Sequence, residues 1–166
     1  MLFRSIFLEI MRQQGMSNDG IFIDPDKNTT VKTRLIAVNQ HIARIDRENR
    51  QNINTNVQEF FLNYLKSLTN LKAIIFEDYN KGLLPKEFIG RVIEFAREKK
   101  IYVTVDPKQE NFFEYRYVNL FKPNLKEAQH ALGFPINSFE DRKRAGKEML
   151  EKLECDNILL TLVQMV

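Results

Sequence analysis

The chain has 166 residues, of which 43% are hydrophobic and 28% are charged, and its formal net charge is +3. This balance is typical of one globular domain with a buried core, and it excludes a disordered or disulfide-stapled chain. The single cysteine, Cys155, excludes an intrachain disulfide and the usual zinc-binding patterns, which favours a reducing compartment, the cytoplasm. Basic residues alternate with acids, as on solvated helix faces, so we expect no nucleic-acid partner.

The first apolar residues have helical spacing, since Leu2, Ile6 and Ile10 recur every four residues. We predict an amphipathic helix over 2–14 that stops at Gly15. Charged residues interrupt this stretch and no small-residue cleavage site follows, so it does not resemble a signal peptide. The longest late apolar run is far shorter than the roughly 20 residues of a membrane span, so we expect no part of the chain to cross a bilayer.

The next hundred residues begin with irregular patterning and then become periodic. Residues 20–30 are predicted to form a short strand and an Asp-Pro turn. Apolar residues in 31–46 flank the polar pair Asn39-Gln40, which predicts two paired strands with the turn at that pair. Residues 57–70 carry apolar side chains at helical spacing, which predicts a helix.

From residue 73 onwards, apolar strands alternate with amphipathic helices. The predicted strands are 73–76, 101–105, 117–121 and 157–162, and the predicted helices are 85–99, 125–132 and 139–153. This alternation indicates parallel βαβ units with helices covering the sheet. We therefore predict a single α/β domain, doubly wound, over residues 1–166.

Polar clusters follow three of these strands, at 77–82, 106–109 and 122–127. In such sheets, ligands bind outside the carboxyl ends of the strands, so all three clusters should lie along one edge. An acid and a lysine recur in the first two, as Asp78 with Lys81 and as Asp106 with Lys108. Lysines can neutralise phosphate. The alternative is that the acids cap turns and the lysines are solvated.

Asn124 and Glu127 lie three residues apart at the start of a predicted helix, so their side chains can face the same side. A carboxylate and an amide there suit hydrated magnesium beside phosphate, because that ion keeps waters and prefers oxygen ligands. The alternative is a capping box, in which each side chain accepts a backbone hydrogen bond at the helix start. The pattern alone leaves both open.

Four stretches together resemble a known family. They are TTVKTRLIAVNQHIARIDRE (29–48), FEDYNKGLL (76–84), VTVDPKQENFFEYR (103–116) and FKPNLKEAQHALG (121–133). In this order and spacing they resemble the ribokinase-like (phosphofructokinase B) carbohydrate kinases, in particular the heptose 7-phosphate kinase module of bifunctional ADP-heptose synthesis proteins. The resemblance implies a doubly wound, mainly parallel sheet flanked by helices.

The resemblance also implies a nucleotide site and its cofactors, ATP and magnesium. The residues that match the family's nucleotide-binding positions are Asn124, Leu125, Lys126, Glu127 and Thr161. Within that set, Asn124 and Glu127 would hold magnesium indirectly, through water. The implied reaction is ATP-dependent phosphorylation of a sugar phosphate, namely heptose 7-phosphate at its anomeric hydroxyl.

A second set of matched positions concerns the sugar phosphate. The cleft between it and ATP would be lined by Asp78, Lys81, Asp106 and Lys108. Arg34, Gln40 and Arg44 match the hairpin of the heptose kinases, and an arginine pair suits an anionic sugar phosphate. The resemblance is also compatible with a homodimer of the longer protein.

Two segments of the family do not occur in these residues. One is a Gly-Gly-Asn substrate segment, and the other is a Gly-Ala-Gly-Asp segment whose aspartate deprotonates the sugar hydroxyl. We therefore expect the catalytic base to lie beyond Val166, and the chain to be an internal fragment of a kinase, incomplete at both ends and inactive alone. The alternatives are a non-catalytic α/β ligand-binding or protein-interaction module, and an unrelated doubly wound regulatory domain.

Overall fold

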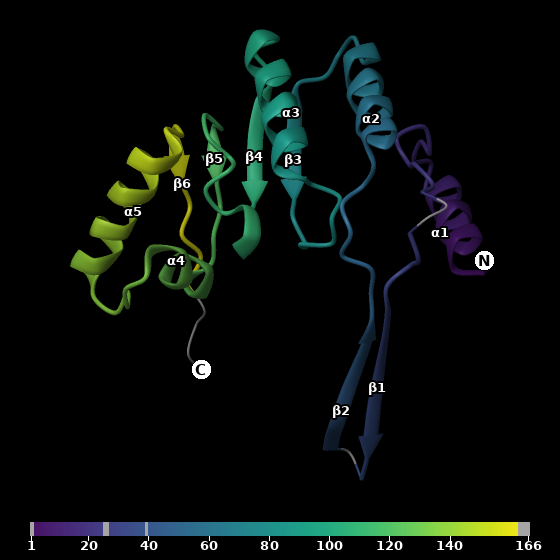
Figure 1. Cartoon of the computed structure of the whole chain (residues 1–166), viewed down its shortest axis with the longest axis horizontal. Helices are drawn as coiled ribbons and strands as arrows, with labels where there is room; N and C mark the ends of the chain where they lie inside the picture. Colours follow the sequence, from purple (N-terminus) through teal and green to yellow (C-terminus); the bar gives the residue numbers. More distant parts are fainter. Residues whose placement is uncertain (1, 25–26, 39, 163–166) are drawn as a thin grey trace.

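The computed structural model describes residues 2–24, 27–38 and 40–162. Figure 1 shows a layered body of helices and strands from which a long two-stranded hairpin projects. The helices are α1 (Leu2–Gln13), α2 (Thr55–Ser67), α3 (Lys86–Glu98), α4 (Leu125–Leu132) and α5 (Phe139–Leu153), with a short 3₁₀ turn at Gln109–Asn111. The strands are β1 (Val31–Ala37), β2 (Gln40–Arg47), β3 (Ala73–Glu77), β4 (Tyr102–Asp106), β5 (Leu120–Phe121) and β6 (Asn157–Ile158).

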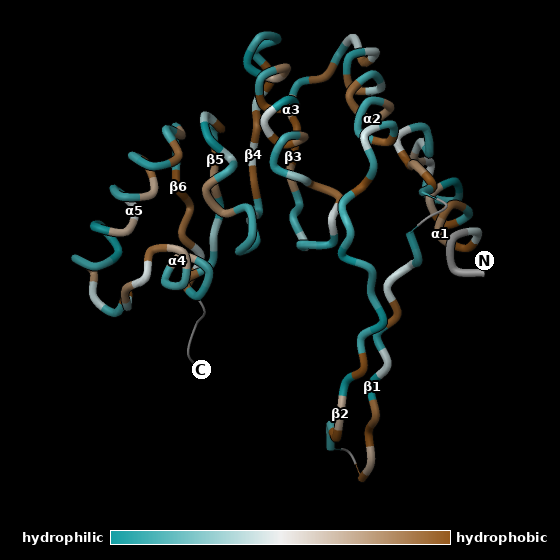
Figure 2. The backbone as a smooth tube through the Cα atoms, viewed as in Figure 1, coloured by the Kyte–Doolittle hydropathy of each residue, from teal (hydrophilic) through white to brown (hydrophobic). Residues whose placement is uncertain are grey.

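The body is built on a four-stranded sheet in the order β3-β4-β5-β6, and all three strand pairs are parallel. This confirms the predicted parallel βαβ arrangement. Val103, Val105 and Phe121 are buried on the sheet, and Figure 2 shows β3 and β4 as the hydrophobic centre of the body. The apolar runs of β3 and β4 identified them as strands, although β3 keeps only Phe76 buried and β4 buries alternate residues, Val103 and Val105.

Two long helices cover the sheet with apolar stripes. On α3, Ile89, Ile93 and Ala96 are buried, a spacing that places them on one face. On α5, the buried residues Ala145 and Met149 recur in the same way. The helix α2 packs beside α3, with the Phe61 and Phe88 rings 6.1 Å apart. No helix within the described residues combines the length and apolar character needed to cross a bilayer.

Three predicted strands differ in the structure. Residues 20–30 form no strand where they are described, because Phe22 packs on the rings of α2 instead of pairing with a neighbouring strand. The predicted strand 117–121 shortens to β5, since Tyr117 has a positive φ of 64° and the Asn119 side chain accepts the Val103 N–H at 2.8 Å. The predicted strand 157–162 shortens to β6 and a bridge between Thr161 and Asn124.

The hairpin is antiparallel, as predicted, and every residue of its strands is exposed. The predicted turn pair lies partly outside the description, because Asn39 is not described and Gln40 begins β2. Since opposed residues share a face, the register puts mainly apolar groups on one face and charged groups on the other. The apolar face carries Val31, Thr33, Leu35, Ala43 and Ile45, with Arg47 opposite Val31 at the hairpin base, and the charged face carries Lys32, Arg34, Arg44 and Asp46.

Candidate functional site at the carboxyl edge of the sheet

The three polar clusters lie side by side along one edge of the sheet, as predicted. The Asp78 N–H donates to the Asp106 carbonyl at 3.1 Å, which joins the ends of β3 and β4. The Lys122 N–H donates to the Val105 carbonyl at 2.8 Å, which joins the ends of β4 and β5. The carboxyl ends of parallel strands therefore bring acids, lysines and an amide together, where ligands of such sheets bind.

A pocket of about 440 Å³ opens at this edge. Its lining comes from the segments after β3, β4 and β5 and from the start of α4, and it consists of Asn80, Lys108, Gln109, Asn124, Lys126, Glu127 and His130. Three residues of this lining were not among the predicted site residues, namely Asn80, Gln109 and His130. Their sequence signal was their position within or just after the predicted clusters.

Asn124 and Glu127 form the capping box of α4. The Asn124 side-chain oxygen accepts the Glu127 N–H, and the Glu127 carboxylate accepts the Asn124 N–H, each at 2.9 Å. The capping alternative is therefore confirmed. The same carboxylate also forms an ion pair with Lys108, so Glu127 connects the helix start to the segment after β4.

The Lys108–Glu127 pair sets the electrostatics of the pocket. Burial lowers the pKa of Lys108, but the hydrogen bond and the charge of Glu127 outweigh burial, so the pKa of Lys108 is raised. Lys108 is thus a fixed positive charge beside a carboxylate that is only 11% exposed. A second pair, in which Lys122 Nζ lies 2.6 Å from the Asp106 carboxylate, repeats the arrangement on the next strand.

Lys122 is the charged residue at this edge that the sequence reasoning missed. It follows β5 directly and precedes Pro123, whereas Lys108 follows Pro107 after β4. The repeated association of lysine and proline at the ends of two strands was the signal that could have identified it. Lys122 adds a third cation at this edge of the sheet, although only Lys108 and Lys126 line the pocket.

Asp78 lies beneath the edge rather than in the pocket, and it is 4% exposed. Its carboxylate accepts hydrogen bonds from the Tyr115 hydroxyl at 2.7 Å, from the Asn111 amide at 3.2 Å and from the Asn80 N–H at 2.8 Å. Burial and the bond to Asp78 raise the pKa of Tyr115. The network fixes the chain after β3, and it uses Tyr115, which was not among the predicted site residues.

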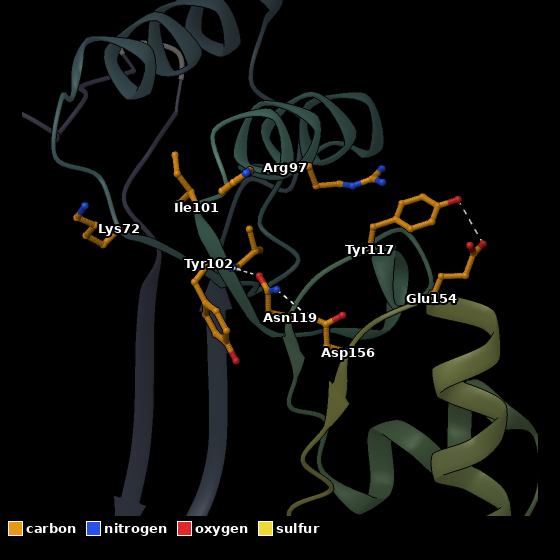
Figure 3. Close-up of a pocket in the computed structure, with 10 residues that line it drawn as sticks. Lys72, Arg97, Ile101, Tyr102, Tyr117, Asn119, Glu154 and Asp156 are labelled. Carbon is orange, nitrogen blue, oxygen red and sulfur yellow. Dashed lines mark hydrogen bonds between the residues drawn. The ribbon is translucent and has the colours of Figure 1, made fainter.

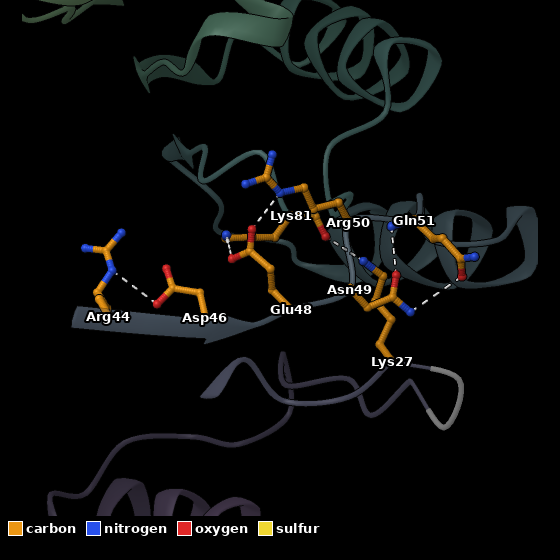
Figure 4. A network of polar contacts seen from close by, with 8 residues as sticks. All are labelled: Lys27, Arg44, Asp46, Glu48, Asn49, Arg50, Gln51 and Lys81. Carbon is orange, nitrogen blue, oxygen red and sulfur yellow. Dashed lines mark hydrogen bonds and ion pairs between the residues drawn. The ribbon is translucent and has the colours of Figure 1, made fainter. Parts of the chain in front are cut away.

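Lys81 points toward the base of the hairpin, where its ammonium pairs with Glu48 (Figure 4). Arg34, Gln40 and Arg44 belong to β1 and β2, the hairpin that projects from the body (Figure 1), and none of them lines the pocket. The structure therefore does not bring these four residues together with the pocket. Thr161, by contrast, lies beside it, because the Leu125 N–H donates to the Thr161 carbonyl at 3.0 Å.

The expected position of the catalytic base falls outside the described part of the chain. Val166, beyond which we expect that base, is itself one of the residues that the structure does not describe, since the description ends at Leu162. None of the residues assembled at the pocket was predicted to be the base. Its position beyond Val166 therefore stays a prediction.

Glu48 should titrate far below an ordinary glutamate. Hydrogen bonds from Lys81 and then from Arg50 lower its pKa to about 2. A carboxyl-carbon NMR titration should show this midpoint, whereas Lys81→Met should move it toward the ordinary value of about 4.3. Since the pKa of Glu48 is depressed in the folded chain, the pairing stabilises the hairpin base at pH values above about 4.3. This stabilisation is lost as the pH falls through about 2. An unshifted midpoint in wild type would contradict the pairing.

The donor groups of the pocket fit hydrated magnesium better than a bare metal ion. In residues 2–24, 27–38 and 40–162, no three His, Cys, Asp or Glu side chains gather as a metal cluster. A single carboxylate, Glu127, with the Asn124 amide beside it can orient water ligands, and magnesium retains such waters. The neighbouring lysines would then meet the phosphates that share the ion.

A second hollow, of about 480 Å³, lies at the opposite edge, around the amino ends of the strands (Figure 3). Four of its polar side chains are paired with one another. The Tyr117 hydroxyl donates to Glu154 at 3.3 Å, and the Asn119 amide donates to Asp156 at 2.7 Å. We attribute this hollow to the packing of side chains at that edge of the sheet. It is slightly larger than the pocket at the carboxyl edge, where the acids, lysines and amide lie.

Comparison with families and curated proteins gives consistent results. Residues 2–163 match the family described as pfkB family carbohydrate kinase. Bifunctional protein HldE of Geobacter metallireducens is 37% identical over 158 residues, covering 95% of this chain and 32% of that protein. Bifunctional protein HldE of Helicobacter pylori is 31% identical over 157 residues, covering 94% and 34%. The chain thus spans about a third of the length of these curated relatives.

Solved structures share the fold. The tetrameric inhibited form of phosphofructokinase-2 from Escherichia coli matches with a TM-score of 0.75 and 12% identity, covering 95% of this chain and 52% of that chain. Phosphomethylpyrimidine kinase from Clostridium difficile matches with a TM-score of 0.53 and 19% identity, covering 80% and 62%. Identities this low bear on the fold alone, and they confirm the ribokinase-like sheet flanked by helices.

Proposed function

The chain belongs to the pfkB family of carbohydrate kinases, and from that premise we propose that it is part of a cytoplasmic kinase domain acting on a sugar phosphate with ATP and magnesium. The observation that supports this is the pocket in which Glu127, the Asn124 cap and Lys108 meet at the carboxyl edge of the sheet. We further propose heptose 7-phosphate, at its anomeric hydroxyl, as the substrate, on the resemblance of the four stretches.

The pocket residues divide the work of holding MgATP. Glu127 and Asn124 would orient the waters of magnesium, and Lys108 and Lys126 would neutralise the phosphates as point charges. Magnesium, when bound, neutralises charge on the transferred phosphoryl group. Because such transfer depends on positioning and charge neutralisation, the fixed charges of this edge are the appropriate apparatus.

The charged face of the hairpin is the proposed contact for the sugar phosphate. Arg34 and Arg44 are directly opposed across the two strands. Like charges in such a position destabilise a ribbon, unless an anion lies between them. Arg44 also contacts Asp46 at 3.1 Å, whereas Arg34 makes no ion pair with the described residues. The phosphate of a sugar phosphate would neutralise the pair by forked hydrogen bonds.

Residues 1–166 contain no Gly-Ala-Gly-Asp segment, so we propose that this chain alone positions phosphate without deprotonating a sugar hydroxyl, and that the base lies beyond Val166 in a longer protein. ATP consumption that depends on added heptose phosphate, measured on the purified chain, would contradict this. The non-catalytic ligand-binding module remains the second candidate, since the pocket could bind a phosphate ligand without chemistry.

Glu127→Gln should weaken MgATP binding to the chain by about 10-fold or more, because a hydrogen bond to a charged group is worth about 1.5–3 kcal/mol. Glutamine can still accept the Asn124 N–H, so the helix cap should persist, although loss of the ion pair with Lys108 should lower the melting temperature slightly. Isothermal titration calorimetry measures the affinity. The matched control is Asp141→Asn in the other capping box, at the start of α5. Equal affinity in wild type and Glu127→Gln would leave Glu127 with only a capping role.

We also propose that the apolar face of the hairpin meets a second copy of the chain. An isolated two-stranded ribbon is marginal in water, and Val31, Leu35 and Ile45 are each more than half exposed on that face. Ile45→Lys should therefore reduce self-association in sedimentation velocity. Phe139→Lys, an exposed apolar residue outside the hairpin, serves as the control. A wild-type chain that stays monomeric at high concentration would refute the proposal.

A further inference from the structure

Both arms of the hairpin converge on two consecutive residues after β3. On the entering arm, the Lys27 ammonium donates to the Lys81 carbonyl at 2.5 Å. On the leaving arm, Glu48 pairs with the Lys81 ammonium, and the Ile53 N–H donates to the Gly82 carbonyl at 2.8 Å. Lys81 and Gly82 thus join both arms of the hairpin to the chain after β3, and Figure 4 shows Lys27, Glu48 and Lys81 at this meeting point.

Gly82 brings two backbones into direct contact. Its φ is +74°, and a Cβ placed on it would lie 2.0 Å from the Gln51 carbonyl oxygen. That oxygen belongs to the leaving arm, a few residues beyond β2. No side chain fits between these segments, so the hairpin base lies against the chain after β3 with backbone contact rather than through flexible side chains.

The chain after β3 is itself fixed to the body. Asp78 is held by the buried Tyr115 hydroxyl and by Asn111, which also donates to the Leu84 carbonyl at 3.0 Å. These bonds anchor the segment on both sides of Lys81 and Gly82. The hairpin strands, in contrast, are exposed along their whole length, so the contacts at the base determine how the hairpin sits.

The charged face of the hairpin runs directly into this base. Arg44, Asp46 and Glu48 alternate along the leaving strand, and Figure 4 shows their side chains on the same side, with Lys81 beside Glu48. Glu48 is 11% exposed and also pairs with Arg50 at 2.6 Å. The ion pair of Lys81 therefore fixes which way the charged face points.

We propose that the contacts of Lys81 and Gly82, here called the joint, fix the position of the β1–β2 hairpin at the carboxyl edge of the sheet. Lys81 is then a positioning residue rather than a phosphate ligand. Its value to catalysis rests on the proposed kinase function, because the joint would hold Arg34 and Arg44 at a fixed place relative to the pocket. The joint itself is a property of the chain and can be tested without any ligand.

The test is a distance measurement by double electron–electron resonance. Spin labels are placed on the hairpin and on α3 by His41→Cys and Glu94→Cys in a Cys155→Ser chain, diluted with unlabelled chain to remove distances between copies. We expect one narrow distance peak. Lys81→Met and Glu48→Gln should each lose that narrow peak, and the exchanged pair Glu48→Lys with Lys81→Glu should regain it.

Lys86→Met, which removes the exposed ion pair with Glu114, is the control and should keep the narrow peak. The proposal is overturned if Lys81→Met and Glu48→Gln keep the wild-type distribution, or if the control broadens as much as they do. Circular dichroism checks that each variant is folded. Titration with MgATP is independent of this result, so a chain that has the joint but binds no MgATP would refute the proposed function alone.

Discussion

Asp78→Ala should lower the free energy of unfolding by several kcal/mol, because each buried donor left without an acceptor costs about 1–3 kcal/mol. The substitution leaves the Tyr115 hydroxyl, the Asn111 amide and the Asn80 N–H without their common acceptor. Urea unfolding followed by circular dichroism measures the effect. Tyr115→Phe should cost less, about 1–3 kcal/mol, because it removes one donor and leaves the other two.

The matched comparison for Asp78→Ala is Asp106→Ala. Asp106 is also an acid at the end of a strand, one strand away, but its side chain is 28% exposed and faces Lys122. Its loss should change stability by at most about 1 kcal/mol, as for surface ion pairs. If both alanine variants were equally stable, the buried network around Asp78 would not be what fixes the chain after β3.

Gly82→Ala should have an effect of similar size, for a different reason. The added methyl group would meet the Gln51 carbonyl oxygen at 2.0 Å, so the hairpin base and the chain after β3 would have to separate. The unfavourable φ costs about 1–2 kcal/mol, and overpacking adds about 1–3 kcal/mol. We expect a lower urea midpoint and faster amide hydrogen exchange at Ile53, whose N–H donates to Gly82.

Gly133→Ala separates the two costs. Gly133 has nearly the same φ, +75°, but nothing lies within 4 Å of a Cβ placed there. It should therefore show the conformational cost alone, and its effect should not reach residues 48–53. Equal losses at Gly82 and Gly133 would mean that the close approach at Gln51 carries no energy.

The secondary structure of this molecule and the edge of the sheet at which its polar clusters lie could be predicted from the sequence. The apolar runs identified β3 and β4, and the helical spacing gave the bounds of α4 and α5 to the residue, because these elements bury one regular face. The rule that parallel strands end at one edge then placed Asp106, Lys108 and Asn124 together. These inferences needed only neighbours in sequence and the direction of the strands.

The parts that escaped prediction depend on distant partners. For Asp78, predicted to line the cleft, the sequence did not indicate the contact with Tyr115, 37 residues further on. For Lys81, predicted to line the same cleft, it did not indicate the pairing with Glu48, 33 residues earlier. β5 shortened because the Asn119 side chain replaces a backbone acceptor. No spacing rule describes such pairs, since a side chain's partner is set by the completed fold.

The two-faced register of the hairpin restricts how its length can vary among related chains. Adding one residue to each strand would reverse the two faces beyond the insertion, because side chains alternate along a strand. The apolar side chains there would then lie on the side of the charged ones. Only changes of two residues per strand preserve both faces, and each such step alters the reach of the ribbon by about 7 Å at about 3.3 Å per residue. The irregularity after Leu35, where β2 carries one extra residue, offers the other route. The length of the hairpin can therefore change only in steps of two residues per strand. An insertion of an odd number of residues in a strand should occur together with a compensating bulge.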